Sequence, residues 1–337
     1  MYTSGFLRRT IESSQIFMRR IMRSMSDPQE RFAILHRWRI QQVKTSTHMF
    51  EVDPGAVLAR GILGSQFIPF QIYVHNPEHC AYISREIAEV GFWEAVKTMR
   101  VIRLMDNVRL QSGRENATFV DVGANIGWYS LAVASQGFPV VAIEPAAYNT
   151  DLLKASIELN SLEDLLKVHQ VLVTDKLEER SCLRLAPYGN PKVNRANFQI
   201  TTFCDDDDDD SNNNGLRSTT IDQIVSNGYY NDIHVIKLDI EGYEAKALRG
   251  AMQLLRSENP PCFVILEYIP AYLKMAGEEN PNLLFSELMR LGYELYPDSP
   301  NGDLKTPPIR ELTSERIVGG RDYELRWPYG RCAMSSL

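Results

Sequence analysis

The chain has 337 residues, 44% of them hydrophobic, with 20 Gly and 17 Pro, so it can bury the core of an enzyme-sized α/β domain and still carry an extension. Its charge is unevenly placed: residues 1–50 hold nine Arg and Lys against three Asp and Glu (net +6), and the remainder holds 27 against 40 (net −13). An acidic body excludes a broad nucleic-acid-binding face, so no nucleic-acid partner is expected.

The five cysteines are scattered and include no Cys-x-x-Cys pair: Cys80, Cys182, Cys204, Cys262 and Cys332. This spacing predicts neither a disulfide framework nor a zinc site, and it indicates a reducing compartment. No apolar run approaches the length of a membrane span. We therefore expect a cytoplasmic protein.

Residues 1–25 are rich in Arg and Ser and contain one acid, Glu12. Their apolar residues recur at three- and four-residue steps, which predicts a helix with an apolar stripe flanked by arginines. Such a helix suits a mitochondrial presequence, contact with a membrane surface, or simple packing against the body. We expect residues 1–60 to form a basic, helical N-terminal extension, with a mitochondrial location as the alternative to the cytoplasm.

After a predicted helix over residues 82–105, the segment from Thr118 to Pro145 organises the chain. It reads as a buried strand, a Gly-rich turn, a small-residue helix and a second strand, at residues 119–122, 123–127, 128–135 and 140–143. The second strand ends on an acid, Glu144. A unit of this kind binds a nucleoside at the carboxyl ends of its strands.

The turn distinguishes between two cofactor classes. We expect Gly123 and Gly127 to let the backbone pass close to a ligand that a Cβ would strike, and Glu144 to accept both hydroxyls of an adenosine ribose. A dinucleotide site requires Gly-x-Gly-x-x-Gly, but Asn125 and Trp128 stand in place of the second and third glycines. S-adenosylmethionine carries no phosphate, so the turn favours it over NAD.

The middle of the chain is less informative. We predict a helix from Asn149 to about Asn160, a strand over 168–174, and a strand pair within 183–203. Asp175, just past the third strand, is a candidate for binding the adenine amino group, or an ordinary turn aspartate. Six consecutive aspartates at 205–210 repel one another, so we expect a disordered acidic insertion at 204–217.

Two later strands bring acids to the same edge of the predicted sheet. His234 to Asp239 and Cys262 to Leu266 are buried strands, and Asp239, Glu241 and Glu267 stand at their ends. Strand ends on that edge face the ligand crevice of a doubly wound sheet. Glu244 follows in a position typical of helix capping.

Several motifs in this order resemble the FkbM family of S-adenosylmethionine-dependent methyltransferases: Asp121-Val-Gly-Ala-Asn-Ile-Gly-Trp-Tyr-Ser, Ile143-Glu-Pro, Ile236-Lys-Leu-Asp-Ile-Glu-Gly-Tyr-Glu, Leu248-Arg-Gly-Ala and Leu266-Glu. The resemblance implies a Class I, Rossmann-like α/β fold, with a mostly parallel seven-stranded sheet and helices on both faces, over residues 61–330. It also implies that Asp121, Gly123, Asn125 and Gly127 line the methionine end of the cofactor. Asp239 would then sit at the methyl-transfer face.

The implied reaction is O-methylation of a hydroxyl on a small molecule, sugar or glycolipid by direct in-line transfer. Asp239 is the candidate base, and we count Glu241 with it as catalytic. Glu241 or Glu267 could instead join Asp239 in holding a divalent ion, but we expect no metal. A non-catalytic nucleoside-binding scaffold and, less favoured, a nucleotide-dependent oxidoreductase are the alternatives.

Overall fold

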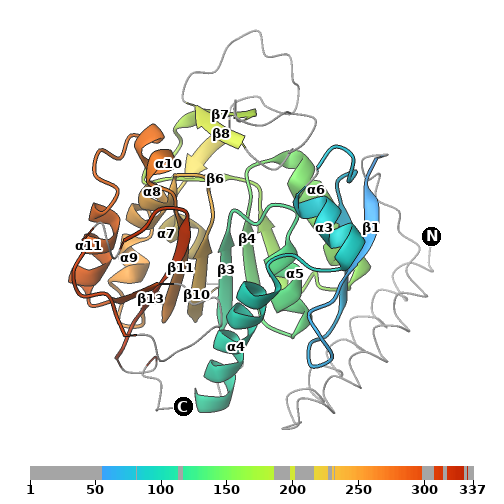
Figure 1. Cartoon of the computed structure of the whole chain (residues 1–337), viewed down its shortest axis with the longest axis horizontal. Coiled ribbons are helices and arrows are strands. Elements are labelled where there is room, and N and C mark those ends of the chain that lie inside the picture. The colour runs from blue at the N-terminus through green and yellow to red at the C-terminus, as the bar shows by residue number, and fades with distance from the viewer. Residues whose placement is uncertain are drawn as a thin grey trace.

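A computed structural model describes residues 55–80, 82–112, 117–185, 198–201, 216–226, 230, 232–297, 307–313, 317–329 and 332. Its centre is a seven-stranded sheet in the order β12-β13-β11-β10-β3-β4-β5 (Figure 1). The strands are β3 (Thr118–Val122), β4 (Val140–Ile143), β5 (Leu166–His169), β10 (Ile233–Leu238), β11 (Phe263–Tyr268), β12 (Glu294–Pro297) and β13 (Arg321–Arg326).

The sheet is mostly parallel, because β13 alone runs opposite to the other six strands and so pairs antiparallel with β11 and β12. The chain builds β3, β4 and β5 outward in one direction and then returns to place β10 on the other side of β3. Such a reversal opens a crevice at the carboxyl ends of the strands that flank it. The predicted fold class is confirmed.

Helices cover both faces of the sheet (Figure 1). They are α3 (Ile83–Val90), α4 (Ala95–Ser112), α5 (Trp128–Ser135), α6 (Ala147–Leu159), α7 (Ile221–Val225), α8 (Glu244–Arg249), α9 (Met252–Leu255), α10 (Pro270–Met275) and α11 (Leu283–Leu291). Alternate residues of β3 supply two separate cores: Phe119 packs in one with α4 to α6, and Val120 in the other with α7 to α11. Period-two alternation of a strand buried on both faces produces this arrangement.

Two smaller sheets flank the main one. β1 (Val57–Gly61) and β2 (Phe70–Val74) form an antiparallel hairpin, and the predicted N-terminal boundary at residue 60 falls inside β1. The second sheet has the order β6-β9-β7-β8, from β6 (Leu172–Val173), β7 (Arg180–Leu185), β8 (Phe198–Thr201) and β9 (Leu216–Thr219). β7 and β8 pair antiparallel, which confirms the predicted strand pair.

Three predicted elements differ from the structure. The single helix over 82–105 is wrong: α3 ends at Gly91, whose φ of +84° is a left-handed C-cap, and α4 begins after Glu94. The third strand is two, because the chain leaves the main sheet after β5 and enters the second sheet at β6. α6 begins at Ala147 rather than Asn149, which lies buried inside the helix.

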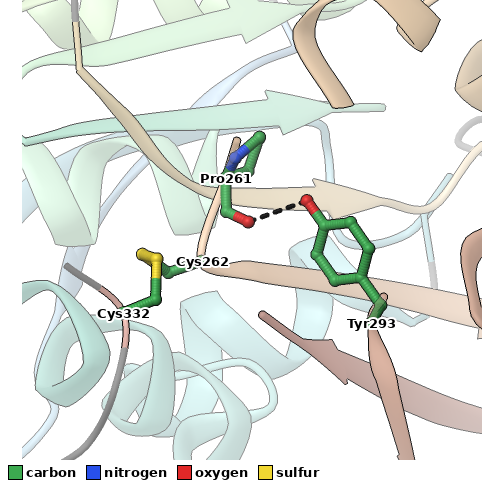
Figure 2. Close-up of a disulfide and its surroundings, with 4 residues drawn as sticks. All are labelled: Pro261, Cys262, Tyr293 and Cys332. Carbon is green, nitrogen blue, oxygen red and sulfur yellow. Dashed lines mark hydrogen bonds between the residues drawn. A yellow bond between two sulfur atoms is a disulfide. The ribbon is translucent and has the colours of Figure 1, made fainter. Parts of the chain in front are cut away.

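A disulfide joins Cys262, just before β11, to Cys332 near the chain end, with Cα atoms 5.2 Å apart (Figure 2). The expectation that these cysteines are unpaired was wrong. They are 70 residues apart in sequence, and antiparallel pairing of β13 with β11 brings the tail back, so that the Trp327 amide donates to the Cys262 carbonyl at 2.9 Å. The inference of a reducing compartment loses the support it drew from cysteine usage.

The predicted N-terminal helix and the hexa-aspartate run lie outside the described residues. The predicted end of the acidic insertion, residue 217, falls inside β9. Within the described part of the chain, no helix combines the length and the apolar character needed to cross a membrane.

Candidate active site

A cavity of about 280 Å³ opens at the carboxyl ends of β3, β4 and β10. Its wall includes the turn after β3, the acid after β4, the start of the second sheet at residues 171–173, and the segment after β10. Tyr82 and Ile83 complete it from the start of α3, and Trp93 and Glu94 from the connection between α3 and α4. The cavity therefore lies in the crevice that the strand order creates.

Gly123 is required by the protein itself rather than by a ligand. Its φ is +83°, and a Cβ there would lie 1.9 Å from the carbonyl oxygen of Asp239 on the neighbouring strand's end. Asn125 also adopts a left-handed conformation, with φ of +51°, which Asn tolerates better than most residues. This explains why the turn holds Asn where a dinucleotide site would need Gly.

Gly127 does not line the cavity, contrary to the expectation for it. A Cβ there would lie 2.1 Å from Cδ1 of Leu153, so this glycine allows α5 to pack closely against α6. Of the two glycines in the turn, Gly123 borders the cavity and Gly127 serves helix packing.

Glu144 lies at the cavity wall and is only 6% exposed. One carboxylate oxygen accepts the Asn125 amide at 3.0 Å, and the other accepts the Ala146 amide and the Asn149 side-chain amide, each at 3.1 Å. Burial raises the pKa of Glu144 above its ordinary value, and these three donors oppose the rise. The carboxylate is thus held in one orientation before any ligand arrives.

Asp121 lies beneath the turn rather than in the cavity wall. It is 1% exposed and accepts a hydrogen bond of 2.6 Å from the Ser130 hydroxyl on α5, while its Oδ1 has no hydrogen-bond partner within the described residues. Burial raises the pKa of Asp121, and the charge of Lys237 opposes the rise. Asp121 therefore supports the site from behind.

Asp175 also lies away from the cavity. Its carboxylate pairs with Arg249 of α8 at 3.0 Å. The residues that reach the cavity from this part of the chain are the apolar Val171, Leu172 and Val173. The structure therefore does not bring Asp175 to the position expected of an adenine ligand.

Asp239, Glu241 and Glu267 all line one end of the cavity, together with Lys237. Lys237 is 7% exposed, and its ammonium group lies 3.0 Å from Asp239 and 4.7 Å from the centre of the Tyr129 ring. Burial alone would lower the pKa of Lys237, but the negative charges of Asp239 and Asp121 outweigh it and raise that pKa.

The turn that carries Glu241 is held by Glu244. The Glu244 carboxylate accepts the amides of Ile240 and Gly242 at 3.0 and 3.3 Å. Both amides precede α8, so Glu244 braces the turn instead of capping the helix. Glu241 itself has a φ of +55°, and a Cβ on Gly242 would lie 2.5 Å from the backbone of Tyr272. The position of Glu241 is thus imposed by a strained, closely packed turn.

The charges at this end are crowded. Burial and then the charge of Asp239 raise the pKa of Glu241 to about 7, and burial followed by Asp239 and Glu241 raises the pKa of Glu267 to about 8. Among the described residues, no group of three or more His, Cys, Asp or Glu side chains is arranged to hold a metal ion. Because their pKa values lie near neutral pH, Glu241 and Glu267 are the two acids of this group suited to exchange protons there.

Sequence reasoning missed Tyr129 and Lys237 as site residues, and it offered Trp93 and Glu94 either as a lid over the cofactor or as a core anchor and a solvated acid. The Tyr129 hydroxyl donates to Glu94 at 2.8 Å, and Lys237 lies over the Tyr129 ring. A lysine inside the otherwise apolar strand His234 to Leu238 was a usable signal, because a buried Lys needs a partner.

The family model described as the methyltransferase FkbM domain matches residues 121–295, just over half of the chain. The chain belongs to the FkbM methyltransferase family. No curated protein has a significant match to its sequence.

Solved structures similar to this FkbM chain include the METTL16 MTase domain, at 13% identity and a TM-score of 0.40, with 70% of this chain and 68% of that one covered. WbdD is similar at 15% identity and a TM-score of 0.39, with 72% and 42% covered. A putative O-methyltransferase from Klebsiella pneumoniae is similar at 11% identity and a TM-score of 0.36, with 68% and 79% covered. Similarity at this level carries no argument about the acceptor.

This FkbM protein is an S-adenosylmethionine-dependent methyltransferase. Its cavity suits that cofactor, because fixed hydrogen-bond acceptors, an apolar wall and a carboxylate cluster border the same space. The apolar residues at 171–173 suit an adenine, and the acids at the other end suit a cationic sulfonium.

Proposed function

We propose that this enzyme methylates a hydroxyl oxygen of a small molecule, sugar or glycolipid. The observation that carries the proposal is the cluster of Asp239, Glu241 and Glu267 at one end of the cofactor cavity. Hydroxyl groups donate hydrogen bonds, and carboxylates are the side chains that accept them most strongly. An acceptor that is itself anionic would be repelled by the same cluster.

In the proposed arrangement, Glu144 accepts one ribose hydroxyl and residues 171–173 pack against the adenine. Asn125 and Gly123 form the wall beside the methionine portion. Glu144 already accepts three hydrogen bonds, yet its two oxygens provide about four lone-pair sites, which leaves room for a ligand donor. S-adenosylmethionine supplies an electrophilic methyl group on a sulfonium.

Asp239 is the proposed base. The acceptor oxygen forms a bond to the methyl carbon as the carbon–sulfur bond breaks, and the hydroxyl proton passes to Asp239. Lys237 forms an ion pair of 3.0 Å with Asp239 and holds that carboxylate in position. Glu241, with its pKa of about 7, is matched to give up or take up a proton near neutral pH.

We also propose that transfer needs no metal ion, since the buried Lys237 already places a positive charge beside Asp239. The remaining demand on the protein is to align the acceptor and exclude water. Chelation with EDTA should leave the transfer rate unchanged, and a loss restored by Mg²⁺ would overturn this part of the proposal.

The first experiment is calorimetric titration of S-adenosylhomocysteine into the wild type and Glu144→Ala. We expect micromolar binding by the wild type and a loss of about 2 kcal/mol in the variant, as for a charged hydrogen-bond acceptor. Equal affinities would remove Glu144 from the cofactor site.

The acceptor is then sought by incubating the enzyme with methyl-labelled cofactor and fractionated small molecules, sugars and glycolipids. Label in an alkali-stable ether would support the proposal, because ethers resist the hydrolysis that releases methyl esters. Label found only on nitrogen would overturn O-methylation while leaving the cofactor assignment intact.

A further inference from the structure

A polar seam runs along one face of α6, a helix that otherwise packs in the core. Asn149, Ser156 and Asn160 are buried, with exposed fractions of 1%, 0% and 7%. Their spacing of seven and four residues places them on the same side of the helix. Buried polar side chains need hydrogen-bond partners, so the seam must face polar groups of another element.

That element is the hairpin strand β2. The Ser156 hydroxyl accepts the Tyr73 amide at 2.9 Å. The Asn160 side chain accepts the Gln71 amide at 2.9 Å and donates to the Gln71 carbonyl at 2.6 Å. These bonds satisfy the β2 edge that does not pair with β1, and they fix the register of the hairpin against α6.

The same register brings His75, the residue after β2, to Asn149 at the start of the seam. His75 is 2% exposed, and its Nε2 lies 2.8 Å from Oδ1 of Asn149. The Asn149 amide nitrogen donates to Glu144 at 3.1 Å. A reversed amide would set its oxygen against the carboxylate, so the Asn149 oxygen faces His75 and the imidazole Nε2 carries the proton.

We infer that His75 and Asn149 are positioning residues that fix the orientation of the Glu144 carboxylate for the cofactor. His75 fixes the Asn149 amide, and the amide then holds one of the two Glu144 oxygens. The inference rests on the proposed role of Glu144. It also makes the β1–β2 hairpin, which precedes the matched residues 121–295, part of the cofactor site.

The test is the Kd of S-adenosylhomocysteine, measured by calorimetry on the full chain. Asn149→Leu keeps the approximate side-chain volume but removes the donor, and we expect its Kd to rise about tenfold, the loss of one charged hydrogen bond. His75→Phe should raise the Kd about threefold or more by leaving the Asn149 amide unfixed. His75→Gln should restore most of the affinity, because its amide also offers an N–H donor.

Ser156→Ala is the matched control. It breaks one bond between α6 and the hairpin, while the two bonds from Asn160 to Gln71 still fix the register that brings His75 to Asn149. We expect a lower melting temperature and an unchanged Kd. If Ser156→Ala raises the Kd as much as His75→Phe, the hairpin acts only through overall stability and the inference is overturned.

The Glu144→Ala titration separates the two proposals. If Glu144→Ala binds S-adenosylhomocysteine more weakly while Asn149→Leu and His75→Phe keep the wild-type Kd, the positioning role alone is overturned. If Glu144→Ala binds S-adenosylhomocysteine with the wild-type Kd, both the proposed ribose contact and the positioning role are overturned. Melting curves of each variant identify any that fail to fold. If His75→Phe fails, Asn149→Leu decides the matter, because a wild-type Kd in that variant would overturn the positioning role.

Discussion

The two ends of the cavity satisfy their carboxylates in opposite ways. At the cofactor end, Glu144 accepts hydrogen bonds from two backbone amides and Asn149. At the end proposed to hold the acceptor, within the described residues, the side chains of Glu241 and Glu267 accept no hydrogen bond from the protein, and the charges that raise their pKa values are those of other acids. The Glu144 carboxylate is therefore held in place before a ligand binds, and the Glu241 and Glu267 carboxyl groups are not.

The difference indicates a division of labour. A carboxylate held by fixed donors keeps one geometry and one charge, which suits recognition of a constant part of the cofactor. Carboxylates whose pKa values are raised to about 7 and 8 change charge in the range where enzymes transfer protons.

The largest effect is expected at the acceptor end. Asp239→Asn removes the proposed base but keeps the size of the side chain, so methyl transfer should fall about 10²- to 10⁴-fold. The Kd of S-adenosylhomocysteine should stay within about twofold of the wild type, since Asp239 does not hold the ribose. Initial rates with labelled cofactor measure the fall in methyl transfer, and calorimetry measures the Kd. Full activity in the variant would exclude Asp239 as the base.

The junction of the two ends is the contact between Gly123 and the Asp239 carbonyl. Gly123→Ala sets a Cβ 1.9 Å from that oxygen, so we expect a loss of more than about 3 kcal/mol in the free energy of unfolding. Gly137→Ala is the control, because its φ of +91° is similarly strained but nothing lies within 4 Å. It should cost only about 1–2 kcal/mol. Equal losses in urea denaturation would show that φ strain alone matters.

A distant region provides a change in stability without a change in the site. The Cys262–Cys332 disulfide closes a 70-residue loop and lies at the start of β11, away from the strand ends that carry the cavity. Cys332→Ser should lower the free energy of unfolding by about 2–4 kcal/mol and leave the Kd of S-adenosylhomocysteine unchanged. The melting temperature of the variant should be the same with and without reductant. A reductant-insensitive wild type would contradict the assignment.

The smallest effect concerns pH. A carboxyl group whose pKa is raised to about 8 in the folded state gives its full stabilising contribution below its unfolded pKa of about 4.5, and loses it as pH rises through about 8. The wild type should therefore melt at a lower temperature at about pH 8.5 than at about pH 6.

Glu267→Gln cannot ionise, so its melting temperature should fall less over the same interval. Glu258→Gln, at an exposed position outside the cavity wall, should follow the wild type. Parallel curves for all three proteins would mean that Glu267 does not sense the neighbouring acids.

Local patterns were sufficient for the frame of the fold. The strand, turn, helix and second strand between Thr118 and Glu144 were predictable because each is specified by nearby residues: apolar runs for β3 and β4, and left-handed positions at Gly123 and Asn125 for the turn. The cofactor class followed from the same turn. The placement of Glu144, Asp239, Glu241 and Glu267 at one cavity also followed, since parallel strands end at a common edge.

The rest depended on contacts between distant segments. Gly127 and Asp121 do not border the cavity. Gly127 leaves room for Leu153 of α6, and Asp121 accepts a hydrogen bond from Ser130 of α5. Asp175 forms an ion pair with Arg249 of α8 and does not border the cavity. Cys262 and Cys332 form a disulfide because the antiparallel strand β13 brings the end of the chain back to β11. The sequence by itself determined the elements and the edge where the chemistry gathers. Tertiary structure alone decided which side chain faces the cavity, because that choice is made by neighbours far away along the chain.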